Sequence, residues 1–248
     1  MLIGIVNSST QVSNEDAYIM AALVDKQLRE HVAPAWGLAP PSVLYMSKPA
    51  EFHYDAIITI FDDADQAGDL GYHTEGPDAD VYGRVFASPV LQNGGNALTN
   101  ALSVCSVLSH ECIETVGDSA CNRWAQRPDG SQVAVELADP VEGDSYEITI
   151  ASPAESATGT VSNFVLPAWF DPDADPGPAD YMKLVTAPFQ VRDTGYVITM
   201  AAGSTTVTEQ WGERYPEWRK ATKADPLART ARRDPQLTTA FKPPTALA

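Results

Sequence analysis

The run His110-Glu111-Cys112-Ile113-Glu114 brings together three side chains that can do metal-dependent chemistry. In an α-helix the side chains at positions i and i+4 lie one above the other, so His110 and Glu114 point the same way from consecutive turns. Glu111 lies one step round the helix from them. An imidazole and a carboxylate at this spacing can bind one divalent ion, with Glu111 beside it as a general base. The pattern therefore indicates a metal site with a base next to it.

This pattern differs by one residue from a zinc-binding helix of known mechanism. Helices of the type H-E-x-x-H bind zinc through two histidines and use the glutamate as base, whereas Glu114 takes the place of the second histidine here. We expect zinc, and because the carboxylate makes the donor set harder and more anionic, calcium and manganese are the alternatives. The competing interpretation is a solvated helix face that carries one histidine and two glutamates by chance.

The helix predicted to carry these residues spans 97–118. Apolar residues recur on one face at the helical period, with Asn96 or Thr99 as the N-cap; they are Leu98, Ala101, Leu102, Cys105, Leu108, Cys112 and Val116. On such a largely buried helix, three unpaired ionisable groups would cost free energy. A bound metal ion or a hydrogen-bonded polar network would offset that cost.

A further ligand is expected from an acidic segment that follows the helix. Asp139 and Glu142 lie on either side of a proline in a turn just past a predicted strand, and one of them is predicted as the third ligand. Glu136, on that strand, would support the ligands by hydrogen bonding. Asp118, four residues beyond Glu114, would orient a ligand in the same way.

A β-hairpin is predicted immediately before the helix. Two short β segments, 70–73 and 81–86, are separated by residues rich in Gly and Pro, which favours a hairpin with an exposed strand. His73 lies on the first segment. It is predicted either to donate a hydrogen bond to a substrate or to be an ordinary half-buried strand histidine.

The remaining segments are predicted to form short strands and one further helix, so we predict an α+β fold. Ser13 and Asp16 form a capping-box pattern that starts a helix running to about His31, and Pro34 is expected to stop it. Strands are predicted at 2–6, 42–46, 56–61, 132–137, 146–150, 161–166, 185–189, 196–200 and 205–207.

Charge divides the 248 residues into an acidic body and a basic arm. Residues 1–210 hold 8 Lys and Arg against 29 Asp and Glu, whereas residues 211–248 hold 8 against 4. We predict one large domain over 1–210, with a surface loop at 171–180 for which calcium binding is the alternative, and a Pro-containing arm over 211–248. An acidic body argues against nucleic-acid binding by the main domain. The arm is expected to be mobile on its own and to lie on an acidic neighbour, such as another copy of this body.

Cysteine usage and hydropathy indicate the cellular setting. Three cysteines do not make a disulfide framework, so Cys105, Cys112 and Cys121 are predicted to be buried free thiols in a reducing cytoplasm. No apolar run approaches 18 residues, and the N-terminus lacks the basic and apolar regions of a secretory signal. We therefore expect no transmembrane segment, no signal peptide and no membrane partner.

Several segments outside the helix form a combined pattern with it: APAWG at 33–37, GYH at 71–73, SHECIETVGD at 109–118, ELADPVEGDSYEI at 136–148 and VSNFVLPAWF at 161–170. Together they resemble a widespread and largely uncharacterised zincin-like family of phage and bacterial proteins. Members of that family share S-H-E-x-x-E-x-x-x-D, then E-x-x-D-P-x-E and V-S-(D/N)-F-x-x-P-x-(W/F)-F. The resemblance spans roughly residues 1–200.

The resemblance implies a zincin-like α+β fold: a mixed twisted sheet with an N-terminal helix and a central H-E-x-x-E helix, then a β-rich half and an extended C-terminal tail. It also implies His110 and Glu114 as metal ligands, with Glu111 at the base position. An adhesin would be the third class of function. It would rest only on aromatic residues such as Trp169, for which packing is the simpler use.

The resemblance further implies a phage virion-associated protein, such as a capsid, decoration or tail component. The protein would be made in the host cytoplasm and located in the virion. Its expected partners are other virion proteins, or copies of itself held through the C-terminal arm. The alternative is an active metal-dependent peptidase or other hydrolase that uses Glu111 as its general base.

Overall fold

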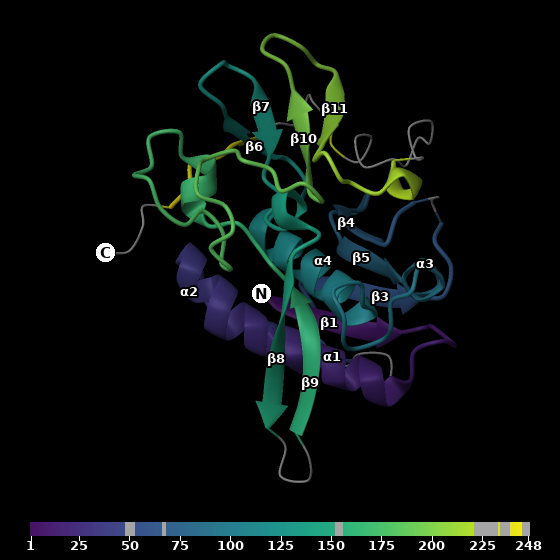
Figure 1. The fold of residues 1–248 in the computed structure, drawn as a ribbon. Helices are drawn as coiled ribbons and strands as arrows, with labels where there is room; N and C mark the ends of the chain where they lie inside the picture. The colour runs from purple at the N-terminus through teal and green to yellow at the C-terminus, as the bar shows by residue number, and fades with distance from the viewer. Residues whose placement is uncertain (48–52, 66–67, 152–155, 221–232, 234–238, 245–248) are drawn as a thin grey trace.

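The computed structural model describes residues 1–47, 53–65, 68–151, 156–220, 233 and 239–244 and has an α+β architecture (Figure 1). Its first sheet has the strand order β2-β1-β3-β5-β4. Strands β2, β1, β3 and β5 run parallel, and β4 pairs with β5 in the antiparallel sense. The strands are β1 (Leu2–Asn7), β2 (Ser42–Tyr45), β3 (Ala56–Phe61), β4 (Gly71–Glu75) and β5 (Val81–Phe86). The predicted hairpin is confirmed, and β4 is an edge strand of this sheet.

The N-terminal helix is a 23-residue rod made of α1 (Asn14–Gln27), a π-helical turn η1 (Leu28–Val32) and α2 (Ala33–Trp36). The predicted start is confirmed, because the Ser13 side chain accepts the Asp16 N–H at 3.0 Å. The predicted stop at Pro34 is wrong. In the wide π turn the Ala33 N–H bonds to Leu28 five residues back, and Pro34 follows as the second residue of α2, so the helical rod continues through it. The rod ends at Gly37, whose φ of 62° is left-handed.

The central helix α4 spans Val104–Asp118, and a shorter helix α3 (Ala87–Gln92) precedes it. The prediction that α4 starts near residue 97 is wrong by seven residues. Its N-cap is Ser103, which exchanges hydrogen bonds with Ser106 in a capping box. The segment before it is a loop of successive bends instead, and its Leu98 carbonyl accepts the N–H of Thr160 at 2.8 Å. Both α1 and α4 pack on the first sheet and contact each other.

The second half of the chain is rich in β structure, as predicted. A hairpin of β8 (Ser145–Ala151) and β9 (Ser156–Ser162) contacts α4 and crosses α1 (Figure 1). A second mixed sheet has the order β11-β10-β7-β6-β12, and its strands are β6 (Arg123–Gln126), β7 (Gln132–Ala134), β10 (Tyr196–Met200), β11 (Val207–Trp211) and β12 (Thr239–Ala240). Three short 3₁₀ helices complete this half: η2 (Asp139–Val141), η3 (Pro167–Phe170) and η4 (Glu217–Arg219). The predicted strand at 185–189 is wrong: the segment is irregular, and the Val185 N–H bonds to the Asp180 carboxylate at 2.6 Å.

The hydrophobic core joins the two halves. One cluster of buried side chains extends from Ile3 in β1 to Val197 in β10. All three cysteines are buried and free, as predicted. Trp169 is fully buried, which confirms packing as its use. No described helix has the length and apolar character needed to cross a lipid bilayer.

The described parts of the C-terminal arm pack on the body of the same chain. β12 pairs in parallel with β6, and the Phe241 ring lies against Trp36 and Phe170 at centroid distances of 6.2 and 5.5 Å. Arg233 is 2% exposed. Residues 221–232, 234–238 and 245–248 of the arm lie outside the described residues. The arm was predicted to lie on an acidic neighbour. At Arg233 that neighbour is the body of the same chain.

Candidate functional site

A cavity of about 310 Å³ lies where α4, β4 and the 139–142 turn meet. His110, Glu111 and Glu114 line it from α4, and His73 lines it from β4. Trp218 contributes from the arm, and apolar side chains such as Leu102 supply another part of the wall. The cavity therefore combines a cluster of ionisable groups with an apolar surface, which is the usual composition of a small-molecule or peptide site.

His110, Glu114 and Asp139 form a compact group inside this cavity. The Nε2 atom of His110 lies 3.2 Å from Glu114 Oε1 and 3.1 Å from Asp139 Oδ1. One candidate ligand atom from each residue lies within 4.8 Å of the others, and all three residues are buried. The spacing of i and i+4 on α4 brings the first two together, and the η2 turn brings Asp139 to them.

Burial and the neighbouring charges both shift the pKa values of this group. Burial disfavours the charged imidazole of His110, but the nearby Glu114 and Asp139 outweigh it, so the pKa of His110 lies well above its ordinary value. Burial, and then the charge of Asp139, raise the pKa of Glu114 well above the ordinary range. A divalent cation would remove this conflict, because it favours deprotonation of all three groups at once.

Glu111 and His73 form the second part of the cluster. His73 Nδ1 lies 3.7 Å from Glu111 Oε2 and 3.6 Å from Glu114 Oε2, beyond ordinary hydrogen-bonding distance. Glu111 is 4% exposed, and its Oε2 has no hydrogen-bond partner among the described residues. A Cβ atom at Gly71 would lie 2.7 Å from Glu111 Oε1, so this glycine leaves room for the glutamate beside β4.

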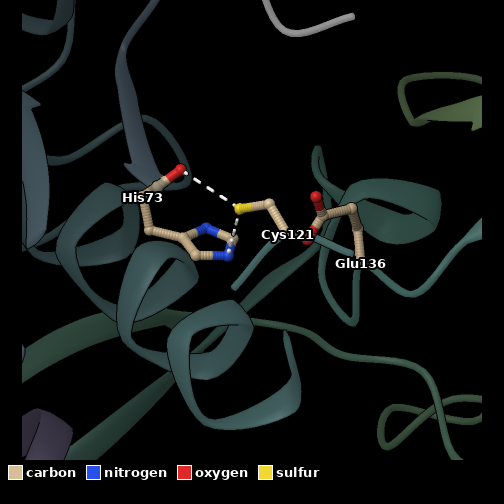
Figure 2. A group of neighbouring side chains, drawn as sticks. All are labelled: His73, Cys121 and Glu136. Atoms are coloured by element: carbon tan, nitrogen blue, oxygen red, sulfur yellow. Dashed lines mark hydrogen bonds between the residues drawn. The ribbon is translucent and has the colours of Figure 1, made fainter. Parts of the chain in front are cut away.

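The other side of the His73 ring faces Cys121 and the end of α4. Its Nε2 lies 3.0 Å from the Asp118 carbonyl oxygen and 3.3 Å from Cys121 Sγ, and the thiol donates to the His73 carbonyl at 3.5 Å (Figure 2). Burial would lower the pKa of His73, but Cys121 and the carboxylates of Glu111 and Glu136 raise it well above its ordinary value. His73 was expected to be substrate-facing or half-buried; it is 4% exposed and is part of the cluster.

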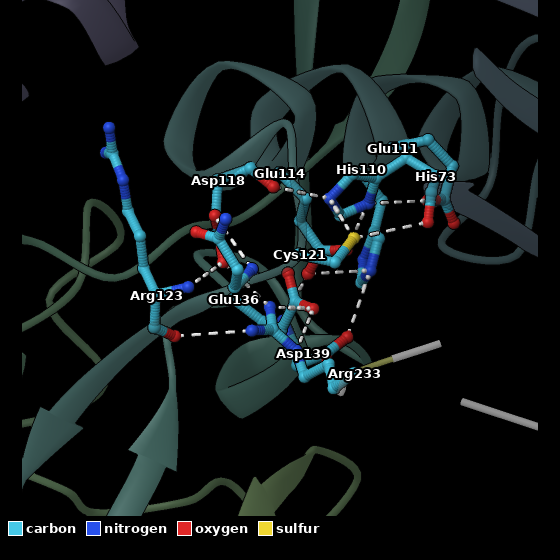
Figure 3. Close-up of polar contacts among 11 residues, drawn as sticks. His73, His110, Glu111, Glu114, Asp118, Cys121, Arg123, Glu136, Asp139 and Arg233 are labelled. Carbon is cyan, nitrogen blue, oxygen red and sulfur yellow. Dashed lines mark hydrogen bonds and ion pairs between the residues drawn. The ribbon is translucent and has the colours of Figure 1, made fainter. Parts of the chain in front are cut away.

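Arg233 from the arm lies beside Glu136 and Asp118 at this site (Figure 3). Its guanidinium donates to Glu136 Oε1 at 2.6 Å and to Asp118 Oδ2 at 3.1 Å. Asp118 also accepts the N–H of Arg123 at 2.9 Å, so its side chain holds the segment after α4. Of the two residues predicted to support the ligands, Asp118 contacts His73 through its main-chain oxygen, and Glu136 pairs with the arm.

Asp139 and Glu142, the two candidates for the third ligand, have different neighbours in the structure. Asp139 lies beside His110, whereas the Glu142 carboxylate forms an ion pair with Arg219 of η4. Glu142 lines the cavity but does not belong to any group of described residues whose ligand atoms converge. The difference arises because η2 turns the two side chains in different directions.

Three groups of described residues can hold a metal ion: His110 with Glu114 and Asp139, His73 with Glu111 and Glu114, and His73 with Cys121 and Glu136. In the third group Glu136 is already paired with Arg233, and His73 Nε2 is engaged by the Asp118 carbonyl. The first group pairs one imidazole with two carboxylates, and no described residue outside the group forms a hydrogen bond or ion pair with His110 Nε2. It therefore fits a divalent ion best.

Sequence reasoning missed Arg233 and Cys121 as neighbours of the site. The excess of basic residues in the arm over an acidic body was the available signal for Arg233, but it did not select one residue. Cys121 follows the helix by three residues and has a left-handed φ of 49°, which no residue pattern announces. Both side chains reach the site through turns and long-range packing.

Comparisons of the chain with protein-family models, with curated proteins and with solved structures gave no match.

Proposed function

We propose that this protein is a metal-dependent hydrolase with a zincin-like domain, and that His110, Glu114 and Asp139 bind its metal ion. The observation that carries the proposal is Glu111 Oε2, a buried carboxylate oxygen that has no hydrogen-bond partner among the described residues and lies beside this group. Leaving such an atom unpaired costs free energy, which a catalytic role explains. The resemblance of the 109–118 segment to zincin-like proteins points to the same chemistry.

The residues have separate tasks in this proposal. A divalent ion, with zinc expected and calcium or manganese as alternatives, would lower the pKa of a bound water and polarise a carbonyl. Glu111 would accept the proton of the attacking water through its Oε2 and pass it to the leaving group. The edge position of β4 favours a peptide substrate, because an extended chain could pair with main-chain groups on its outer side other than the His73 carbonyl, which accepts from Cys121.

The test combines metal binding with hydrolysis of a fluorescent casein. Metal-stripped protein should bind Zn²⁺ in calorimetry, and His110→Ala should weaken that binding by at least about tenfold, since it loses one of three ligands. Glu111→Gln should still bind the ion, and its hydrolysis rate should fall by about 10²- to 10⁴-fold. Glu147→Gln, an exposed glutamate on β8, is the matched control and should keep both properties. Failure to bind Zn²⁺, Mn²⁺ or Ca²⁺ would overturn the proposal, as would full activity in Glu111→Gln.

The phage virion is the proposed setting of this activity. The motifs at 109–118, 136–148 and 161–170 support it through their resemblance to phage proteins. Other virion proteins, or copies of this chain contacted through the arm, are the proposed partners. Mass spectrometry of purified particles from a host that expresses this chain tests the idea. Finding the protein only in the unassembled fraction would contradict it.

A further inference from the structure

The Glu114 carboxylate faces two histidines, one from each oxygen. Its Oε1 lies 3.2 Å from His110 Nε2, and its Oε2 lies 3.6 Å from His73 Nδ1 (Figure 3). A carboxylate whose two oxygens point at two separate ligand groups is the arrangement that bridges a pair of metal ions in two-metal hydrolytic sites. Glu114 therefore belongs to two converging groups, one on each of its sides.

The orientation of His73 suits it to bind an ion through Nδ1. Its Nε2 lies 3.0 Å from the carbonyl oxygen of Asp118, and a carbonyl can only accept. Nε2 must therefore carry the proton, and in the neutral imidazole the lone pair is then on Nδ1, the atom that faces Glu111 and Glu114. Metal-binding histidines are commonly fixed in this way by a main-chain carbonyl on the other ring nitrogen.

Glu111 supplies a second observation at this position. Its Oε2 points toward His73 Nδ1 at 3.7 Å, is buried, and has no hydrogen-bond partner among the described residues. The His73, Glu111 and Glu114 side chains are each 5% exposed or less. Among the residues that the structure describes, no Lys or Arg forms an ion pair with Glu111 or Glu114. Two buried carboxylates whose ion-pair partners among these residues are histidines alone are a favourable place for a cation.

We propose that His73, Glu111 and Glu114 form a second divalent-metal position, joined to the first by the Glu114 carboxylate as a bridge. This inference rests on the proposed function, because Glu114 is shared with the His110 and Asp139 position. It also has a functional consequence. An ion in the second position engages Glu111, which is then no longer free to accept a proton. Activity should therefore rise as the first ion binds and fall as the second position fills.

The number of bound ions tests this directly. Metal-stripped protein dialysed against Mn²⁺, with the bound metal counted by mass spectrometry, should hold two ions per chain. Its paramagnetic resonance spectrum should show the exchange coupling of a bridged pair. His73→Ala should hold one ion with an uncoupled spectrum. Glu111→Gln keeps the size of the side chain, so it serves if His73→Ala does not fold, and it should also drop from two ions to one.

Each outcome separates the two proposals. One ion in the parent protein, retained in His73→Ala and lost in His110→Ala, would overturn the second position and leave the first standing. One ion that is retained in His110→Ala and lost in His73→Ala would overturn the proposed function instead. No bound ion would overturn both, and a His73 ring protonated between two carboxylates would then explain the geometry without metal.

Discussion

At the scale of single residues, the buried carboxylates of the site differ in what neutralises them. Glu136 and Asp118 share Arg233, and Glu142 has Arg219. Glu111, in contrast, has an imidazole as its only ion-pair neighbour among the described residues. Because a buried charge without a partner is costly, the distribution of arginines marks which carboxylates are structural and which are left for a cation.

His31 gives a pH-dependent contribution to stability away from the cluster. Its Nδ1 shares a hydrogen bond of 2.8 Å with the Tyr146 hydroxyl, which also accepts from Gln27, and its ring stacks on Tyr181. Burial lowers the pKa of His31, so the folded state resists a proton that the unfolded state takes up near pH 6.5. Stability contributed by the neutral ring is therefore present above that pH and is lost as the pH falls below it, through the lowered pKa of the folded state.

Replacing His31 by glutamine should make the free energy of unfolding less sensitive to pH. We expect His31→Gln to lose less stability than the parent protein between pH 7 and pH 5, by a few tenths of a kcal/mol, since water screens the partly exposed ring. Urea denaturation at the two pH values measures this difference. His53→Gln is the matched control, because it removes an exposed histidine outside this cluster. An equal change in the pH dependence of both variants would contradict the role given to His31.

At the scale of elements, Gly195 determines how closely β10 approaches the η2 turn. A Cβ atom there would lie 2.8 Å from the Asp139 carbonyl oxygen and nearer still to the carbonyl oxygen of Pro140. Both are main-chain atoms, so the turn itself would have to move. Gly195→Ala should destabilise the fold by about 1–3 kcal/mol and draw Asp139 away from His110, which weakens metal binding.

Thermal unfolding and Zn²⁺ calorimetry test this prediction together. Gly177→Ala is the control, because the nearest atom to its Cβ is 3.9 Å away and its φ is not left-handed. It should change neither property. A Gly195→Ala protein with parental stability and parental affinity would show that the packing of β10 on η2 does not position Asp139.

Local sequence patterns predicted the interiors of the elements better than their ends. The i and i+4 spacing on α4 correctly brought His110 and Glu114 together, and alternation and turn residues correctly predicted the β4–β5 hairpin. The start of α4 was predicted too early because Leu98 bonds to Thr160 on β9, a partner 62 residues away that periodicity does not reveal. The π turn before Pro34 was missed for a similar reason. The spacing of apolar residues does not reveal that a main-chain N–H bonds to the carbonyl five residues back.

At the scale of the whole molecule, the arm completes the body that it follows. Arg233 places its guanidinium between Asp118 at the end of α4 and Glu136 beyond β7, and it also donates to the Arg123 carbonyl at 3.2 Å. The charge composition predicted that the arm would lie on an acidic surface. It did not indicate whether that surface belongs to the same chain or to another copy, or which basic residue of the arm would contact it. That choice depends on the turns that bring residues 118 and 136 together.

Removing Arg233 should therefore destabilise the whole fold. Arg233→Met leaves two buried carboxylates without their cation, which costs about 3–5 kcal/mol. Burial already raises the pKa of Glu136, and Arg233 opposes that rise. Without the arginine the folded-state pKa rises further, and a carboxyl group of raised pKa loses stability as the pH increases. The loss in Arg233→Met should thus be larger at pH 8 than at pH 5.

Urea denaturation in the presence of a chelator measures this loss without interference from metal. Arg214→Met is the matched control, because its pair with Asp193 is exposed and should contribute about 0–1 kcal/mol. Since Arg233 reaches carboxylates of its own chain, the loss should not depend on protein concentration. A loss that appears only at high concentration would instead mean that the arm docks on a second copy. A loss as small as that of Arg214→Met would mean that Asp118 and Glu136 do not depend on the arm.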